Sequence, residues 1–162
     1  MPDDIGYTTW YHQDEMGDPT GPPFKLKYLP DQLWSFFIQP PRFVPYFPWM
    51  RAPNAGIALT WTSPALVLAL FARRPRYLVA AMWAAVALLA GPLLIYYVNG
   101  ASQFGMRHAL DFEPYLFVLM GLALREDRSA TFNAVASVLM WYSILFGFWG
   151  LWYWRNFFRP HY

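Results

Sequence analysis

Two apolar stretches decide the fold of this chain: residues 77–98, YLVAAMWAAVALLAGPLLIYYV, and residues 130–154, ATFNAVASVLMWYSILFGFWGLWYW. Neither stretch contains a charged side chain. A helix needs about 20 consecutive apolar residues to cross the hydrocarbon core of a bilayer. Each stretch therefore predicts one transmembrane helix.

Two further spans are predicted on weaker grounds. Residues 55–72 form an uncharged run, and residues 114–124 form a run that is too short to cross, so that its helix is expected to start near Ser102. Pro64 and Pro92 should kink the first and second helices. The sequence thus predicts an all-α polytopic membrane protein with four transmembrane helices, at about 55–72, 77–98, 102–124 and 130–154.

Composition agrees with a membrane protein. Of the 162 residues, 57% are hydrophobic, 21% are aromatic and 14% are charged, whereas about 25% of residues are charged in soluble domains. This excludes a disordered chain, a coiled coil and most soluble enzymes. The absence of cysteine excludes disulfides, thiolate zinc sites and thiol catalysis. A net charge of +2 gives no support to a nucleic-acid partner, and the lipid bilayer is the expected partner.

The first 54 residues differ from the rest, because they contain ten of the fifteen prolines and no run that is long enough to span. We expect three parts: an extracytoplasmic or interfacial segment at 1–54, the transmembrane domain at 55–154 and an extracytoplasmic tail at 155–162. Asp31 is expected to cap a short interfacial helix at about 31–38. Four aromatic residues then alternate with prolines, which predicts either a rigid loop at headgroup depth or one wall of a groove for a lipid-linked substrate: Phe43, Tyr46, Phe47 and Trp49.

The arginines set the expected orientation. Arg73, Arg74 and Arg76 lie between the first two predicted spans, and Arg125 and Arg128 lie between the last two. The positive-inside rule places both turns in the cytoplasm, and the N-terminal segment and the C-terminal tail outside. Because an acidic N-terminal segment would then have to cross the membrane without a signal, we expect Met1 not to be the native start and the chain to be the C-terminal part of a longer protein.

The charged cluster before the third apolar run is the most informative polar feature. Arg107 and Asp111 are four residues apart, so on an α-helix they would share a face and pair. They either neutralise each other at a helix end, or Arg107 binds a phosphate or carboxylate with Asp111 orienting it and His108 assisting. No metal site is expected, because His108, Asp111 and Glu113 would be scattered around the helix.

Several short motifs resemble a known family. They are YLPDQLW at 28–34, FF at 36–37, PP at 40–41, PYFP at 45–48, TSPAL at 62–66 and QFGMRHALDF at 103–112. Together they are similar to the C-terminal half of bacterial membrane glycosyltransferases of the GT-C superfamily, which use polyprenyl-phosphate-linked sugars. The resemblance covers about residues 20–125, and its most specific part is 103–111.

This resemblance implies a carrier-binding role. Arg107 would contact the carrier phosphate with Asp111 as its partner, and the aromatic loop would line the entry. In that superfamily the catalytic carboxylate lies in the first extracytoplasmic loop, to which no part of this chain corresponds, so no catalytic residue is assigned. No cofactor is expected, although a divalent metal in the complete enzyme stays open.

Two functions are therefore expected. In the first, the chain is the C-terminal membrane portion of a glycosyltransferase-like, multi-pass protein of the bacterial cytoplasmic membrane. It would bind a polyprenyl-phosphate-linked sugar at the outer face and depend on a missing N-terminal membrane half or partner subunit. In the second, the chain is a non-enzymatic integral membrane subunit or scaffold.

Overall fold

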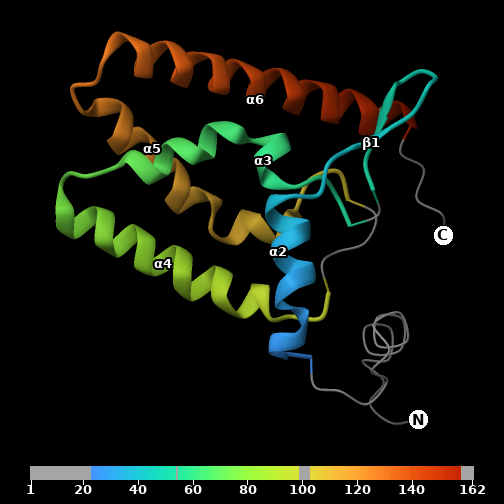
Figure 1. Ribbon diagram of the computed structural model, residues 1–162, viewed down its shortest axis with the longest axis horizontal. Helices are drawn as coiled ribbons and strands as arrows, with labels where there is room; N and C mark the ends of the chain where they lie inside the picture. Colours follow the sequence, from blue (N-terminus) through green and yellow to red (C-terminus); the bar gives the residue numbers. More distant parts are fainter. Residues whose placement is uncertain (1–22, 54, 99–102, 158–162) are drawn as a thin grey trace.

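The computed structural model describes residues 23–53, 55–98 and 103–157 (Figure 1). Helices make up most of it, and the sheet in this part of the chain has two short strands. The elements in chain order are η1 (Leu26–Tyr28), α2 (Leu29–Phe37), β1 (Arg42–Phe43), β2 (Met50–Arg51), α3 (Leu59–Thr62), η2 (Pro64–Phe71), α4 (Arg76–Leu94), η3 (Arg107–Asp111), α5 (Glu113–Arg125) and α6 (Ala130–Phe157), where η denotes a 3-10 helix.

Two of the helices are long and apolar. Helix α4 has 19 residues and helix α6 has 28, and the most apolar 18-residue windows of the two helices have mean hydropathies of 2.0 and 1.7. By length and composition both are able to cross a membrane. The long apolar helices that the sequence predicts at 77–98 and 130–154 are thus confirmed as helices of spanning length.

The prediction of four spans is not supported, because the described residues of 55–72 and 102–124 form broken helices rather than single α-helices of spanning length. Residues 55–72 form the four-residue α3 and the 3-10 helix η2, with a break at Ser63 (φ −142°, ψ 57°). The break precedes Pro64, which lacks an N–H group and disfavours α-helical geometry in the residue before it. In the segment 102–124, a 3-10 helix, η3, precedes the 13-residue α5. Helix α5 is about 20 Å long, which is less than a bilayer core of about 30 Å.

The short segments lie between the long helices (Figure 1). Segment η2 packs on α5, while α5 also contacts α4 and η2 also contacts α6. Both α4 and α6 begin at the end of the molecule where the two arginine-bearing turns meet, and α2 and the hairpin of β1 and β2 lie at the opposite end. We call the first the arginine end; it carries Arg73, Arg74, Arg76, Arg125 and Arg128.

The core is built around the short elements. Ala69 of η2, Ala109 of η3 and Ala123 of α5 are fully buried, and such small side chains let neighbouring segments approach closely. Helix α4 contributes no buried residue, although parts of one face pack against this core. Helix α6 buries only Ala136, Phe146, Gly150 and Tyr153. The outer faces of both long helices are therefore apolar and uncovered in the described structure.

The short helix predicted at 31–38 is confirmed as α2, which begins two residues earlier. Asp31 is not its N-cap, because Pro30 already lies inside the helix and Asp31 falls in its first turn. The buried side of α2 carries Gln32, Ser35 and Phe36. Trp34 is 52% exposed, so the helix turns a large apolar side chain outward, as a helix at a membrane interface does.

The proline-rich aromatic segment forms a hairpin rather than an irregular loop. Strands β1 and β2 are antiparallel, with Arg42 opposite Arg51. Regular pairing is compatible with Pro45 and Pro48 because both prolines lie in the connection between the strands. At the end of that connection Trp49 adopts a left-handed backbone conformation with φ of 62°.

Candidate functional site

The motif at 103–112 is held by the backbone of residues 55–57. Gln103 Nε2 donates a 2.6 Å hydrogen bond to the carbonyl of Ala55, and the Ile57 N–H donates a 2.8 Å bond to the carbonyl of Phe104. Gly56 lies between these contacts with φ of +86°, and a Cβ there would stand 2.9 Å from the Gly105 carbonyl oxygen. Glycine at position 56 therefore permits the close approach that positions the segment leading into Arg107.

The ring of Phe104 anchors the same segment to α6. Its centroid lies 5.6 Å from that of Trp149 and 6.3 Å from that of Tyr153. The ring fits because Gly150 has no side chain, since a Cβ at that position would be 2.3 Å from Phe104 Cε1. Close packing of an aromatic ring on a glycine thus fixes residues 103–106 between α6 and residues 55–57.

A cavity of about 380 Å³ opens beside this anchored segment. Its wall combines apolar side chains with hydroxyl, amide, guanidinium and carboxylate groups that come from four parts of the chain. The lining residues are Leu59, Thr62, Gln103, Phe104, Gly105, Met106, Arg107, Leu110, Glu113 and Trp154. Such a mixture suits a ligand with an anionic group and hydroxyls.

Arg107 is the predicted site residue that lines this cavity. The expected ion pair between Arg107 and Asp111 is not formed, because the segment is a 3-10 helix with three residues per turn. Residues four apart then point about a third of a turn away from each other. Both side chains are exposed, and in the described parts of the chain the guanidinium of Arg107 has no ion-pair partner.

His108 and Asp111 do not line the cavity. His108 is half-buried, and its Nε2 atom is enclosed without a hydrogen-bond partner in the described structure. Burial lowers the pKa of His108 most, the Arg107 charge lowers it further, and Asp111 opposes both effects. At neutral pH the imidazole is therefore uncharged, and it does not add a second positive charge beside Arg107.

Five polar or aromatic lining residues were not predicted as ligand contacts: Thr62, Gln103, Phe104, Glu113 and Trp154. Gln103 and Glu113 lie within or just after the motif around Arg107, so their position in the sequence was a usable signal. Thr62 and Trp154 reach the cavity from α3 and α6, and only the tertiary arrangement shows this.

An apolar groove of about 570 Å³ adjoins the cavity, and Leu59 lines both. The groove runs among η2, α4 and α5, and its wall is almost wholly hydrocarbon. Its lining residues are Phe37, Leu59, Thr60, Ser63, Pro64, Leu66, Val67, Leu70, Trp83, Val86, Ala90, Phe112, Leu116 and Leu139. It offers space to a hydrocarbon chain beside the polar cavity.

The four aromatic residues predicted to line a groove belong to neither space. Phe43, Tyr46, Phe47 and Trp49 are exposed on the hairpin. Phe47 packs edge-on against Trp152 at 5.5 Å, close to the cavity residue Trp154 on the same helix. The hairpin therefore lies near the cavity, while its role as an entry wall stays a prediction.

In residues 23–53, 55–98 and 103–157, no three histidine, aspartate or glutamate side chains come together as a metal site would need. His108, Asp111 and Glu113 are close in sequence, but only Glu113 faces the cavity. The chemistry of the cavity in this part of the chain is therefore that of an arginine, a glutamate, an amide and a hydroxyl.

Comparison with known proteins adds no relative: no family model, curated protein or solved structure matches the chain. The fold and the cavity alone define the class, which is a mainly helical protein with two helices of membrane-spanning length. The resemblance to GT-C glycosyltransferases stays an expectation from the motifs.

Proposed function

We propose that this chain is an integral membrane protein that binds a polyprenyl-phosphate-linked sugar through the cavity beside Arg107. The observation that carries the proposal is an arginine that has no ion-pair partner among the described residues and lines a polar cavity beside an apolar groove. In this arrangement Arg107 binds the phosphate, and the prenyl chain lies in the groove. Crossing of the membrane is assigned to α4 and α6.

Exposure of apolar surface supports the membrane assignment. Helix α4 has no buried residue, and Leu88 on it is 75% exposed. On α6, Val138 and Leu151 are 68% and 71% exposed. Each Å² of apolar surface left in water costs roughly 25 cal/mol, so a lipid environment stabilises such helices. The core helix of a soluble protein would instead be mostly buried.

The chemistry of the cavity supports a phosphate bearing a sugar. A guanidinium donates two parallel hydrogen bonds to phosphate oxygens and keeps its charge at every relevant pH. Glu113 lines the same cavity and offers a hydrogen-bond partner to a sugar hydroxyl. Burial raises the pKa of Glu113, which favours the neutral form that can also donate a hydrogen bond.

The position of the cavity supports action at the outer face. Its lining includes Trp154 near the C-terminal end of α6, whereas α6 begins at the arginine end. If α4 and α6 cross the bilayer with the arginines in the cytoplasm, the cavity lies towards the outer leaflet. A sugar carried by a lipid on that leaflet would reach the cavity without leaving the membrane.

We also propose that the protein transfers the sugar, on the motif resemblance at 103–111. No catalytic residue of this chain is assigned. A carrier-binding subunit without transferase activity is the other candidate, and the two differ in one measurement. A preparation that both binds the carrier and passes its sugar to an acceptor supports the enzyme, and binding without transfer supports the subunit.

Replacing Arg107 by alanine is expected to weaken binding of a polyprenyl phosphate by about tenfold to a hundredfold, because a charge-assisted hydrogen-bond pair is lost. The measurement is ligand binding to the full chain purified in detergent, by native mass spectrometry. A polyprenol without phosphate should bind the wild type and the variant equally, because the groove is unchanged.

The matched control is Arg42→Ala, which removes the same charge from the exposed hairpin. It should leave phosphate binding unchanged. Equal affinity of Arg107→Ala and the wild type for the polyprenyl phosphate would remove the basis of the proposed function.

A further inference from the structure

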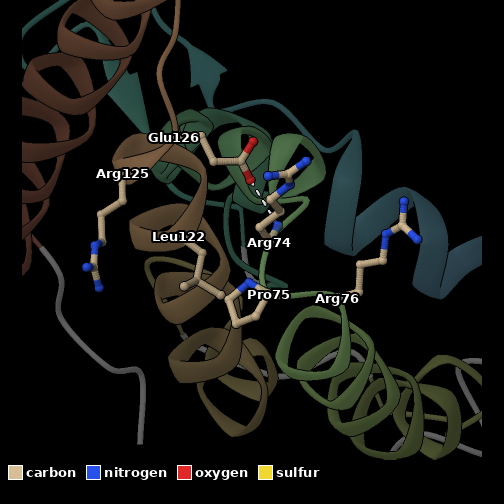
Figure 2. A pocket seen from close by; sticks show the side chains of 6 residues that line it. All are labelled: Arg74, Pro75, Arg76, Leu122, Arg125 and Glu126. Carbon is tan, nitrogen blue, oxygen red and sulfur yellow. Dashed lines mark hydrogen bonds between the residues drawn. The ribbon is translucent and has the colours of Figure 1, made fainter.

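A second cavity, of about 720 Å³, lies at the arginine end, away from the site around Arg107. It is a cleft between the turn before α4 and the C-terminal end of α5, and we call it the arginine cleft. It is lined by Arg74, Pro75, Arg76, Leu122, Arg125 and Glu126 (Figure 2).

The acidic residue of the arginine cleft is already engaged. Glu126 Oε1 accepts hydrogen bonds from the backbone N–H groups of Arg73 at 2.6 Å and Arg74 at 3.1 Å. Glu126 Oε2 pairs with the guanidinium of Arg128 at 2.8 Å, and that guanidinium also donates to the carbonyl of Phe71. The charge of Glu126 is therefore compensated by the guanidinium of Arg128 and by two backbone N–H groups.

The charges of the three arginine side chains of the cleft are not compensated within the described structure. Arg74, Arg76 and Arg125 are exposed, and the described structure pairs none of their guanidinium groups with a carboxylate. Figure 2 shows Arg74 turned towards Glu126, and Arg76 and Arg125 on opposite sides of Pro75 and Leu122. The three like charges repel each other. An anion between them would relieve this repulsion.

We propose that the arginine cleft binds the phosphate headgroup of an anionic phospholipid. This rests on the assignment of α4 and α6 as spanning helices. Helix α4 begins at Arg76 beside the cleft, and α6 begins five residues after Arg125. The cleft then lies at headgroup depth, where anionic lipids attract arginine. Its floor of Pro75 and Leu122 suits the apolar part of the same lipid.

The test compares two lipids on the full chain purified in detergent. Native mass spectrometry measures binding of phosphatidylglycerol and of phosphatidylcholine to the wild type and to Arg74→Gln/Arg76→Gln/Arg125→Gln. The wild type should bind phosphatidylglycerol about tenfold more tightly than phosphatidylcholine, and the triple variant should lose this preference. Three arginines at the opposite end make the matched control, Arg42→Gln/Arg51→Gln/Arg155→Gln, which should keep it.

Several outcomes would overturn the proposal. Equal binding of both lipids by the wild type would refute the site, whether or not the triple variant folds. An unchanged preference for phosphatidylglycerol in the triple variant would also refute it. Binding of inorganic phosphate that displaces phosphatidylglycerol would identify a free-anion site instead. A failure of the proposed carrier site is distinguishable, because Arg107→Ala should keep the preference for phosphatidylglycerol. A chain that stays soluble without detergent would refute the membrane assignment itself.

Discussion

Alanine at position 150 is expected to destabilise the protein by about 1–3 kcal/mol relative to alanine at position 147, which is typical of overpacking. A Cβ added at position 150 would lie 2.3 Å and 2.5 Å from two atoms of the Phe104 ring. The ring also contacts Phe146, Trp149 and Tyr153, so α6 limits its movement on that side. It must shift towards the cavity that it lines. We therefore expect weaker binding of a polyprenyl phosphate as well as lower stability.

Gly147→Ala is the matched control, because a Cβ at Gly147 meets nothing within 4 Å. Both substitutions raise helix propensity by roughly the same amount, about 1 kcal/mol, so their difference isolates the contact with Phe104. The measurement is thermal unfolding in detergent together with carrier binding. Equal stability and equal binding of the two variants would show that Phe104 does not pack on Gly150 in the way described.

Loss of the Glu126 side chain is expected to have the second large effect. Its carboxylate joins the two arginine-bearing turns, since it accepts the Arg73 and Arg74 N–H groups and pairs with Arg128. The side chains of Glu126 and Arg128 are only 19% and 12% exposed. Glu126→Ala leaves these donors without their acceptor, and we expect the melting temperature to fall by several degrees. Asp127→Ala, which removes the same charge from the exposed neighbour, should change it little.

Acidification should remove the contribution of Glu126 to the stability of the wild type. The hydrogen bond from the Arg73 N–H, with that of Arg74 and the Arg128 charge, holds the pKa of Glu126 below its usual value of 4.5 against an opposing effect of burial. A carboxyl whose pKa is lower in the folded state stabilises the fold above pH 4.5, and this contribution is lost as the pH falls through the folded pKa. The difference in melting temperature between the wild type and Glu126→Ala should therefore narrow on acidification. A constant difference would contradict this role.

The long helices and the short helix α2 follow from sequence alone, because an apolar run of bilayer length and a run that ends at Pro40-Pro41 leave few alternatives. The predicted span at 55–72 differs from the structure for a specific reason. It is apolar enough to span, but Ser63 and Pro64 break it into α3 and η2. Hydropathy measures composition and does not register where the backbone leaves α-helical geometry.

The site was predictable only in part. Arg107 stands out because a charge beside an apolar run is costly unless it has a role. Its pairing with Asp111 was expected on α-helical spacing and is lost in the 3-10 geometry of η3. Thr62 and Trp154 enter the cavity through packing between segments that are distant in the chain. The sequence alone gives no signal for such contacts.

We propose that α4 and α6 cross a membrane and separate the arginine end from the end bearing α2. The chain has no cysteine, so single cysteines are specific probes. Asp127→Cys at the arginine end and Asp31→Cys on α2 would be tested with a membrane-impermeant maleimide on intact cells and on inverted membrane vesicles. We expect the Asp31→Cys variant to react only in intact cells and the Asp127→Cys variant only in inverted vesicles. Reaction of both positions from the same face would contradict it.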